Sequence, residues 1–278
     1  MSSLPYVDGY IDLEGVRVFH RCWVETPVET MIVALHGLCD HSGRYEHVGQ
    51  ELSRLGASVC MIDLRGHGRT SLGEDRGHIE SFNDFLVDLE AFLKYLNNLY
   101  TPRTFVLMGY DLGGLIALHY VARVKRFVRG QILIAPATTY TASFPSMLGF
   151  RSRRSPRAPM DPPIDFNKIS TDPQVAKSFI NDPYTLKKVS ARMLYEISRA
   201  MKDLPKYLNA VANPTLVIHG ERDEIVPPRT SSELVRRLRT PIKELRIEPG
   251  AGHDILHEPP WKEIVAYIAA WIREHITH

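Results

Sequence analysis

Residues 105–114 read Phe-Val-Leu-Met-Gly-Tyr-Asp-Leu-Gly-Gly, and they pass from an apolar run through a glycine-flanked aspartate directly into an amphipathic run. The first run predicts a buried strand and the second a helix. Gly109 and Gly113 flank Asp111, because side chains at these positions would collide with the strand and the helix at so sharp a turn. We expect a strained turn that holds Asp111 outward as a nucleophile elbow does.

The same alternation of short and long elements runs along most of the chain. We expect strands at 16–24, 31–35, 59–62, 105–108, 132–135, 216–219 and 245–247, and helices at 45–55, 82–99, 112–124, 230–238 and 261–275. Short β-branched runs that alternate with longer helical ones are typical of βαβ units around a mostly parallel sheet. The predicted fold class is therefore α/β.

The alternation breaks in the middle of the chain. Residues 138–207 contain prolines, a basic run and helix-like pieces, and no strand is expected among them. We interpret 138–207 as an inserted helical cap, so the core would comprise 1–137 and 208–278.

Composition excludes several classes of protein. The chain has 278 residues, 44% hydrophobic and 24% charged, as expected for a large globular unit. Its formal net charge is only +2, so no nucleic-acid partner is expected. Oligomeric state stays open.

The cysteines and the first residues bear on the compartment. The chain has an odd number of cysteines, Cys22, Cys39 and Cys60, and their spacing is not that of metal ligands. We therefore expect reduced thiols and no metal site. Residues 1–9 lack a basic stretch followed by an apolar run, and no segment approaches the roughly 18 to 20 apolar residues of a membrane span. The prediction is a soluble cytoplasmic protein.

An acid and a histidine follow the last two predicted strands. Asp223 comes after 216–219, and His253 comes after 245–247. Together with Asp111 they give the chain order nucleophile, acid, histidine that an elbow of this kind requires. In such a triad the acid orients the imidazole and the histidine works as the base. We predict Asp111, Asp223 and His253 as the catalytic residues.

A second loop completes the predicted site. His36-Gly37-Leu38-Cys39 follows the strand at 31–35, where an oxyanion-hole loop is expected. The backbone N–H groups of Leu38 and Leu112 would then point at the developing oxyanion. We expect His36 to fix this loop and Cys39 to pack it.

Several motifs together resemble one known family. They are His36-Gly37, residues 41–45 (HSGRY), 63–68 (DLRGHG), the elbow, the Asp223 and His253 segments, and the cap motifs 169–173 (ISTDP) and 181–184 (NDPY). This set is similar to the monoacylglycerol lipase and lysophospholipase branch of the α/β-hydrolases. The resemblance implies an α/β-hydrolase fold that needs no cofactor and acts on acyl glycerols or small acyl esters.

The resemblance also implies a lipid-binding cap. In that family the cap forms an apolar tunnel for an acyl chain. Candidate substrate-binding residues here are Phe144, Met147, Leu148, Phe150, Phe179, Tyr184, Met193 and Leu194. Because lipids would arrive at the cap, its arginines, among them Arg151, Arg153 and Arg154, could make transient contact with a membrane surface.

The chain departs from the family at the elbow. Family members have Gly-His-Ser-x-Gly, whereas this chain has Gly-Tyr-Asp-Leu-Gly at 109–113. A carboxylate is a far better leaving group than an alkoxide, so an Asp111 adduct on an ester would mostly collapse backwards. We therefore expect ester turnover to be weak or absent.

Two other classes of function stay open. Related hydrolases with an elbow aspartate open epoxides, with cap tyrosines as acids, and the cap offers Tyr140, Tyr184, Tyr195 and Tyr207. The proline that usually follows the oxyanion-loop His-Gly by two residues is replaced by Cys39. Haloalkane dehalogenation is less favoured, because Leu112 stands where those enzymes carry a tryptophan. In the remaining class, an Asp111–His253 ion pair would leave a pocket that binds ligand without turnover.

Overall fold

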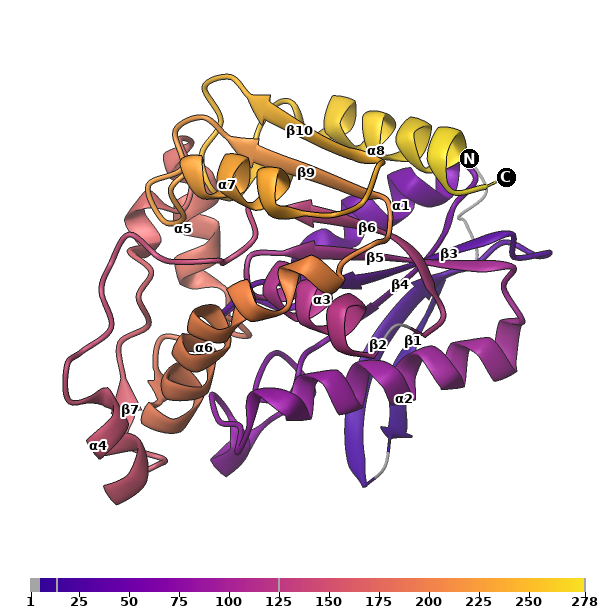
Figure 1. Ribbon diagram of the computed structural model, residues 1–278. Coiled ribbons are helices and arrows are strands. Elements are labelled where there is room, and N and C mark those ends of the chain that lie inside the picture. Colours follow the sequence, from indigo (N-terminus) through magenta and orange to yellow (C-terminus); the bar gives the residue numbers. More distant parts are fainter. Residues whose placement is uncertain (1–5, 14, 125, 278) are drawn as a thin grey trace.

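A computed structural model describes residues 6–13, 15–124 and 126–277, and its centre is a single eight-stranded sheet (Figure 1). The strand order is β1-β2-β4-β3-β5-β6-β9-β10. The strands are β1 (Tyr6–Leu13), β2 (Val16–Trp23), β3 (Thr30–Leu35), β4 (Ser58–Ile62), β5 (Thr104–Tyr110), β6 (Val128–Ile134), β9 (Thr215–Gly220) and β10 (Lys243–Glu248). β2 pairs antiparallel with β1 and β4, and every other pairing in this eight-stranded sheet is parallel. The predicted α/β class is confirmed.

Helices cover both faces of the sheet. Successive strand residues point to opposite sides, so Val33 and Leu107 belong to one buried cluster while Ala34 and Met108 belong to the other. The first cluster packs under α2 (Phe82–Tyr100), α3 (Leu112–Arg123) and α7 (Arg229–Arg237). The second packs under α1 (Glu46–Arg54) and α8 (Trp261–His275), which lie side by side in Figure 1. Strands buried on both faces explain the apolar runs in the sequence.

Each predicted strand and helix of the core has a counterpart within a few residues of its expected bounds. The sequence missed β1, which lies at the edge of the sheet and is mostly exposed. Its glycine and two aspartates weaken the alternation on which strand prediction depends. Short 3-10 turns lie at Ser42–Tyr45, Gly73–Asp75, Phe166–Lys168, Leu204–Lys206, Leu208–Ala210 and Ile255–His257.

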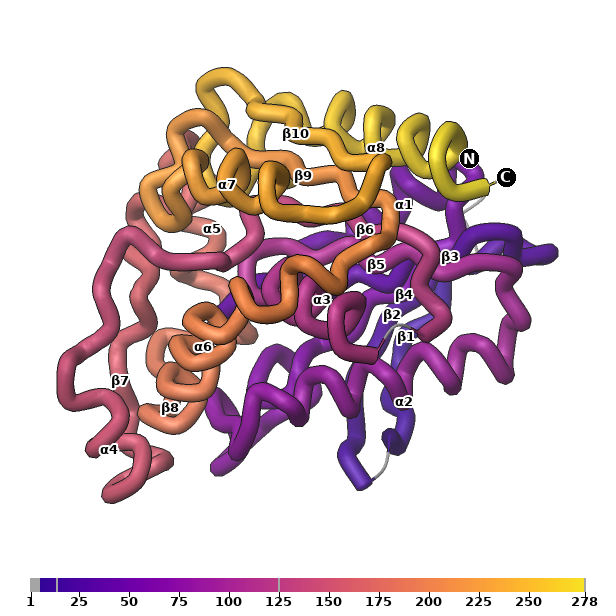
Figure 2. The backbone as a smooth tube through the Cα atoms, viewed as in Figure 1, coloured from indigo at the N-terminus to yellow at the C-terminus, as the bar shows by residue number. Residues whose placement is uncertain are grey.

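The chain between β6 and β9 gathers at one side of the molecule (Figure 2). It carries α4 (Leu148–Arg154), α5 (Pro173–Asn181) and α6 (Ala191–Asp203). It also carries an antiparallel pair, β7 (Pro159–Met160) with β8 (Val189–Ser190). The expectation that this segment holds no strand was wrong, because strands of two residues are too short to show alternation.

The prediction of reduced cysteines was also wrong. Cys22 and Cys60 form a disulfide, whereas Cys39 is free and buried. The two bonded cysteines lie directly opposite each other on β2 and β4, with Cα atoms 4.1 Å apart. They are 38 residues apart in sequence, so only the register of the antiparallel pair brings them together.

Two other observations concern membrane-spanning helices and the N-terminal segment. Among the described residues, no helix combines the length and the apolar character that crossing a bilayer requires. The first five residues of the N-terminal segment considered above lie outside the described residues.

The disulfide makes a countable prediction. Protein unfolded without reductant should expose one reactive thiol per chain, that of Cys39, and three after reduction. Because the bond restrains the unfolded chain, the Cys22→Ser/Cys60→Ser double variant should lose about 2 to 4 kcal/mol of unfolding free energy. Thiol titration and denaturant unfolding measure the two quantities, and three thiols before reduction would contradict the assignment.

Candidate active site

Asp111 occupies a strained turn between β5 and α3. Its φ is 49° and its ψ is −112°, in a region that side chains with a Cβ rarely adopt. The flanking glycines are required by close packing. A Cβ on Gly113 would lie 2.2 Å from the carbonyl oxygen of Leu35, and one on Gly109 would lie 2.3 Å from that of Gly113. The turn therefore has the geometry expected of a nucleophile elbow.

The carboxyl group of Asp111 lies between the predicted oxyanion donors. Its Oδ2 accepts the N–H of Leu38 at 2.8 Å and the O–H of Tyr140 at 3.2 Å. The backbone N–H of Leu112 also acts to lower the pKa of this carboxyl group. Its Oδ1 has no hydrogen-bond partner among the described residues and lies 3.9 Å from Nε2 of His253. One carboxyl oxygen thus occupies the place predicted for an oxyanion.

The structure brings the three predicted catalytic residues together. Nδ1 of His253 donates to Oδ2 of Asp223 at 2.7 Å. Oδ1 of Asp223 accepts the N–H groups of Ile225 and Val226, both at 2.8 Å, so the turn after β9 holds the carboxylate in place. Because Nδ1 of His253 is bonded to Asp223, the other ring nitrogen, Nε2, faces Asp111.

A second histidine supports the acid, and sequence reasoning missed it. Nε2 of His219 lies 2.9 Å from Oδ2 of Asp223 and 3.0 Å from the carbonyl oxygen of Val226. Both partners are acceptors, so this nitrogen carries the proton, and Nδ1 accepts the O–H of Ser231 at 2.6 Å. The only signal in the sequence was a histidine near the end of an otherwise apolar strand.

Burial and neighbouring charges shift the pKa values of Asp111, Asp223 and His253. Asp111 and His253 are each only 1% exposed. Burial by itself lowers the pKa of His253, but the carboxylates of Asp223 and Asp111 raise it to about 9. Burial raises the pKa of Asp111 above its ordinary value, although His253 and the N–H donors oppose this. Burial also acts to raise the pKa of Asp223, but His253 and His219 hold it well below its usual range.

Hydrogen bonds hold the loop that is predicted to supply an oxyanion donor. Nε2 of His36 accepts the N–H of Leu64 at 2.9 Å, and Nδ1 donates to the carbonyl oxygen of Gly37 at 2.8 Å. Cys39 is fully buried, its carbonyl oxygen accepts the N–H of Leu186 at 2.9 Å, and burial raises the pKa of its thiol. His36 therefore fixes the loop and Cys39 packs it.

The predicted substrate-binding residues fall into different environments. Leu148, Phe179, Met193 and Leu194 are buried. Phe144 is half-buried, with its ring 6.2 Å from that of Tyr140, which places it near Asp111. Tyr184 is half-buried with its ring 5.5 Å from that of His41.

Met147, one of the predicted substrate-binding residues, lies at the surface of the structure. Its side chain is 62% exposed, and Phe150 is 56% exposed, while Leu148 between them is buried. Helix α4 turns only Leu148 and Ser152 inward. The helical rotation of α4, which composition does not reveal, decides which apolar residues face solvent.

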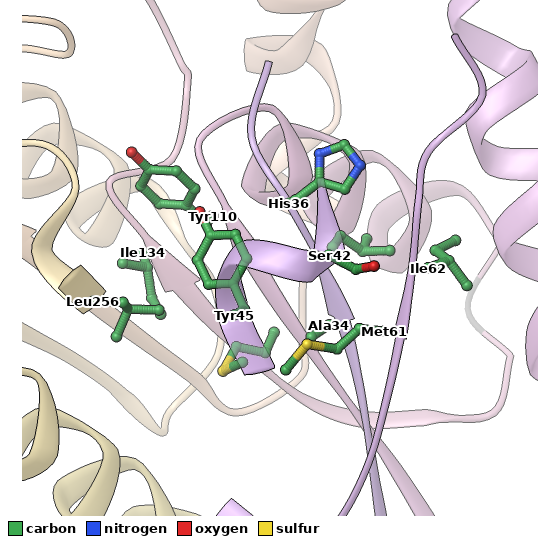
Figure 3. Close-up of a pocket in the computed structure, with 11 residues that line it drawn as sticks. Ala34, His36, Ser42, Tyr45, Met61, Ile62, Tyr110, Ile134 and Leu256 are labelled. Atoms are coloured by element: carbon green, nitrogen blue, oxygen red, sulfur yellow. The ribbon is translucent and has the colours of Figure 1, made fainter. Parts of the chain in front are cut away.

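A small apolar cavity lies beside the elbow (Figure 3). Its volume is about 20 Å³, and Tyr45, Tyr110 and Leu256 contribute to its wall. It lies on the α1 and α8 side of the sheet, because most of its strand residues belong to the cluster under those helices. A space of this size holds at most one water molecule, so it is no acyl-chain site. Within the described ranges no group of three or more His, Cys, Asp or Glu side chains is arranged so that it could hold a metal ion.

The strand order, the elbow and the order of Asp111, Asp223 and His253 define an α/β-hydrolase. Residues 26–260 match the family model of serine aminopeptidases of type S33. The chain belongs to that family, within its monoacylglycerol lipase-like branch.

Relatives and solved structures agree with this placement. A monoacylglycerol lipase of Mycolicibacterium smegmatis is 28% identical over 99% of this chain and 100% of its own length. The monoglyceride lipase of Homo sapiens is 26% identical over 92% of this chain and 86% of its own. The crystal structure of Paleococcus ferrophilus monoacylglycerol lipase has a TM-score of 0.82 at 25% identity, covering 93% of this chain and 99% of that one.

Neutralising position 111 should lower the pKa of His253. In the Asp111→Ser variant the carboxylate that helps to raise this pKa is gone, so we expect the pKa to fall from about 9 by roughly one unit or more. NMR titration of the imidazole measures it. Asp111→Asn, which removes the charge but keeps the size, should behave in the same way; an unchanged pKa in both would contradict the electrostatic account.

The raised pKa of His253 also predicts a pH dependence of stability. The folded value of about 9 exceeds the ordinary 6.5, so the contribution is complete below pH 6.5 and is lost as pH rises through 9. The difference in unfolding free energy between the parent and His253→Gln should therefore shrink across this window. Denaturant titrations at several pH values test it, and a constant difference would argue against a charged His253.

Proposed function

We propose that this chain is a carboxylic ester hydrolase scaffold of the monoacylglycerol lipase type, suited to acyl glycerols or small acyl esters, in which Asp111 makes ester turnover weak or absent. The family and the relatives named above support the first part. The observation that carries the second is the contact between Oδ2 of Asp111 and the N–H of Leu38 at 2.8 Å. The carboxylate itself takes up donors that would have to stabilise an oxyanion.

A serine at position 111 would complete an ordinary ester mechanism. The hydroxyl would attack the acyl carbon, His253 would take its proton, and Asp223 would hold the imidazole. The N–H groups of Leu38 and Leu112 would receive the developing negative charge. With aspartate present, the carboxylates of Asp223 and Asp111 raise the pKa of His253, which opposes its action as a base, and the acyl adduct returns to ester.

We propose further that residues 138–207 act as a cap over this site. Asp111 and His253 are almost fully buried, so an ester could reach them only after displacement of covering residues. Phe144, whose ring lies 6.2 Å from that of Tyr140, a hydrogen-bond partner of Asp111, is the first candidate for binding an acyl chain. Leu148, Phe179, Tyr184, Met193 and Leu194 are the other candidates.

Epoxide opening by Asp111 is the second candidate function. The observation in its favour is Tyr140, whose O–H lies 3.2 Å from Oδ2 of Asp111 and could supply a proton to an opening ring. Oδ1 makes no hydrogen bond among the described residues and could attack. Dehalogenation is less favoured, because Trp23 lies in β2 and Trp261 and Trp271 lie in α8. The ion pair of Asp111 with His253 would equally suit a binding protein without turnover.

The decisive experiment compares the parent chain with Asp111→Ser. We expect the parent to hydrolyse p-nitrophenyl acetate and a monoacylglycerol at or near background, and the serine form to be at least about 100-fold faster, as a restored nucleophile with oxyanion donors allows. Steady-state kinetics measure both.

Matched variants decide between the classes. Asp111→Ser/His253→Ala should lose the gain, because the base is missing. Styrene oxide opening by the parent that disappears in His253→Ala and weakens in Tyr140→Phe would instead establish the epoxide function. Robust ester hydrolysis by the parent that depends on Asp111 would overturn the proposal.

We also propose that the cap makes transient contact with a membrane surface. Met147 and Phe150 are exposed apolar side chains on and beside α4. Arg151, Arg153 and Arg154 are exposed on the same helix and form no salt bridge within the described part of the chain. Exposed apolar residues beside unpaired cations suit an anionic lipid surface.

Vesicle binding tests this contact. The parent should co-sediment with vesicles that contain phosphatidylglycerol more than with purely phosphatidylcholine vesicles, and salt should weaken the binding because it screens the arginines. Phe150→Ser and Arg153→Ser/Arg154→Ser should each reduce it severalfold. Arg103→Ser, an exposed arginine outside the cap, serves as the control. Equal binding by all of these forms would contradict a role for the cap.

A further inference from the structure

We propose that Glu258 is a positioning residue that joins the loop carrying His253 to residues 169–171, so that this part of the cap stays with the catalytic core. The positional claim stands on contacts alone, whereas its effect on catalysis rests on the proposed ester function.

Glu258 is only 2% exposed, and its carboxylate accepts hydrogen bonds from four donors. Its Oε1 accepts the O–H of Ser170 at 2.6 Å and the N–H of Thr171 at 2.9 Å. Its Oε2 accepts the O–H of Thr171 at 3.1 Å and the N–H of Gly252 at 2.9 Å. The donors come from two segments that lie about 80 residues apart in sequence. One donor, the N–H of Gly252, belongs to the residue before His253.

A second contact fixes the other side of the histidine. The N–H of Asp254 donates to the carbonyl oxygen of Ile169 at 2.7 Å. The residues before and after His253 are therefore both tied to the contact with 169–171. A Cβ on Gly252 would lie 2.9 Å from Oε1 of Glu258 and 3.0 Å from the nitrogen of Thr171, so there is no room for a side chain.

The chemistry of the site requires a carboxylate. Both oxygens of Glu258 face donors only, and hydrogen bonds to a buried charged acceptor are stronger than neutral ones. A glutamine would turn its NH₂ toward the backbone N–H of either Thr171 or Gly252 and leave that N–H unpaired, because a hydroxyl can rotate to accept but an N–H cannot. Loss of the carboxylate should loosen the loop that sets the 2.7 Å contact between His253 and Asp223.

This contact also divides the cap. Residues 169–171 are held against the catalytic loop, and Asp172 begins α5 immediately after them by accepting the N–H of Gln174. A displacement that admits substrate would then involve residues on either side of this anchor, while His253 keeps its place.

The test uses Glu258→Gln in the Asp111→Ser background. We expect kcat to fall at least tenfold, because small displacements of a catalytic group are costly, and KM to stay within about twofold. Glu221→Gln is the matched control. Oε2 of Glu221 accepts the N–H of Gly250 at 2.9 Å in the same loop, but Glu221 is exposed and contacts no residue of 169–171 by hydrogen bond. Its kcat should be unchanged.

A second measurement is independent of activity. In the otherwise unaltered chain, Glu258→Gln should speed hydrogen exchange of the Gly252 and Thr171 amides at least tenfold, and Glu221→Gln should not. Thr171→Val, which removes one donor and keeps the shape, should shift both readouts in the same direction by a smaller factor, about two- to fivefold by the modest net worth of one hydrogen bond. It also serves if Glu258→Gln does not fold.

The outcomes separate the proposals. If Glu258→Gln lowers the melting temperature but leaves kcat and the exchange of both amides unchanged, Glu258 is only a packing residue and the inference fails. If Asp111→Ser shows no ester hydrolysis, the proposed function fails, and the amide exchange still decides the role of Glu258.

Discussion

The hydrogen bond from the N–H of Leu38 to Oδ2 of Asp111 joins the two loops on which the site depends. It is possible because Gly109 and Gly113 let β5 turn sharply into α3, and because Gly37 leaves space beside the carboxyl group. An anion in a nest of backbone donors is favourable in itself. The same donors cannot then serve a reaction intermediate, so the contact that orders the site also opposes ester chemistry.

The charge of Asp111 also affects the protonation of His253. His253 lies between Asp223 and Asp111, and the two carboxylates favour its protonated form. His219 acts in the same sense, because its hydrogen bond to Asp223 helps to lower the pKa of that carboxyl group. With a neutral nucleophile at position 111, only the carboxylate of Asp223 would face the imidazole of His253, as in a serine triad. The aspartate adds a negative charge, and the histidine keeps its proton.

Mechanical support for the histidine comes from a different set of contacts. Glu258 gathers donors from 169–171 and from Gly252, and Asp254 adds a bond to Ile169. In the proposed arrangement the cap covers the site and also anchors the histidine loop, so it has to open without disturbing that anchor. The exposed side chains of α4 lie in a different part of the cap, where they are free to contact a surface.

The sequence by itself determined the α/β class, the elbow at Asp111 and the order of Asp111, Asp223 and His253, because these depend on local periodicity and on glycine spacing. Only the tertiary structure decided the Cys22–Cys60 pairing, the place of His219 beside the acid and the outward face of α4. Strand register, helix rotation and the packing of distant loops produce these features. No short window of sequence carries that information, since each contact joins segments that only the folded chain brings within bonding distance.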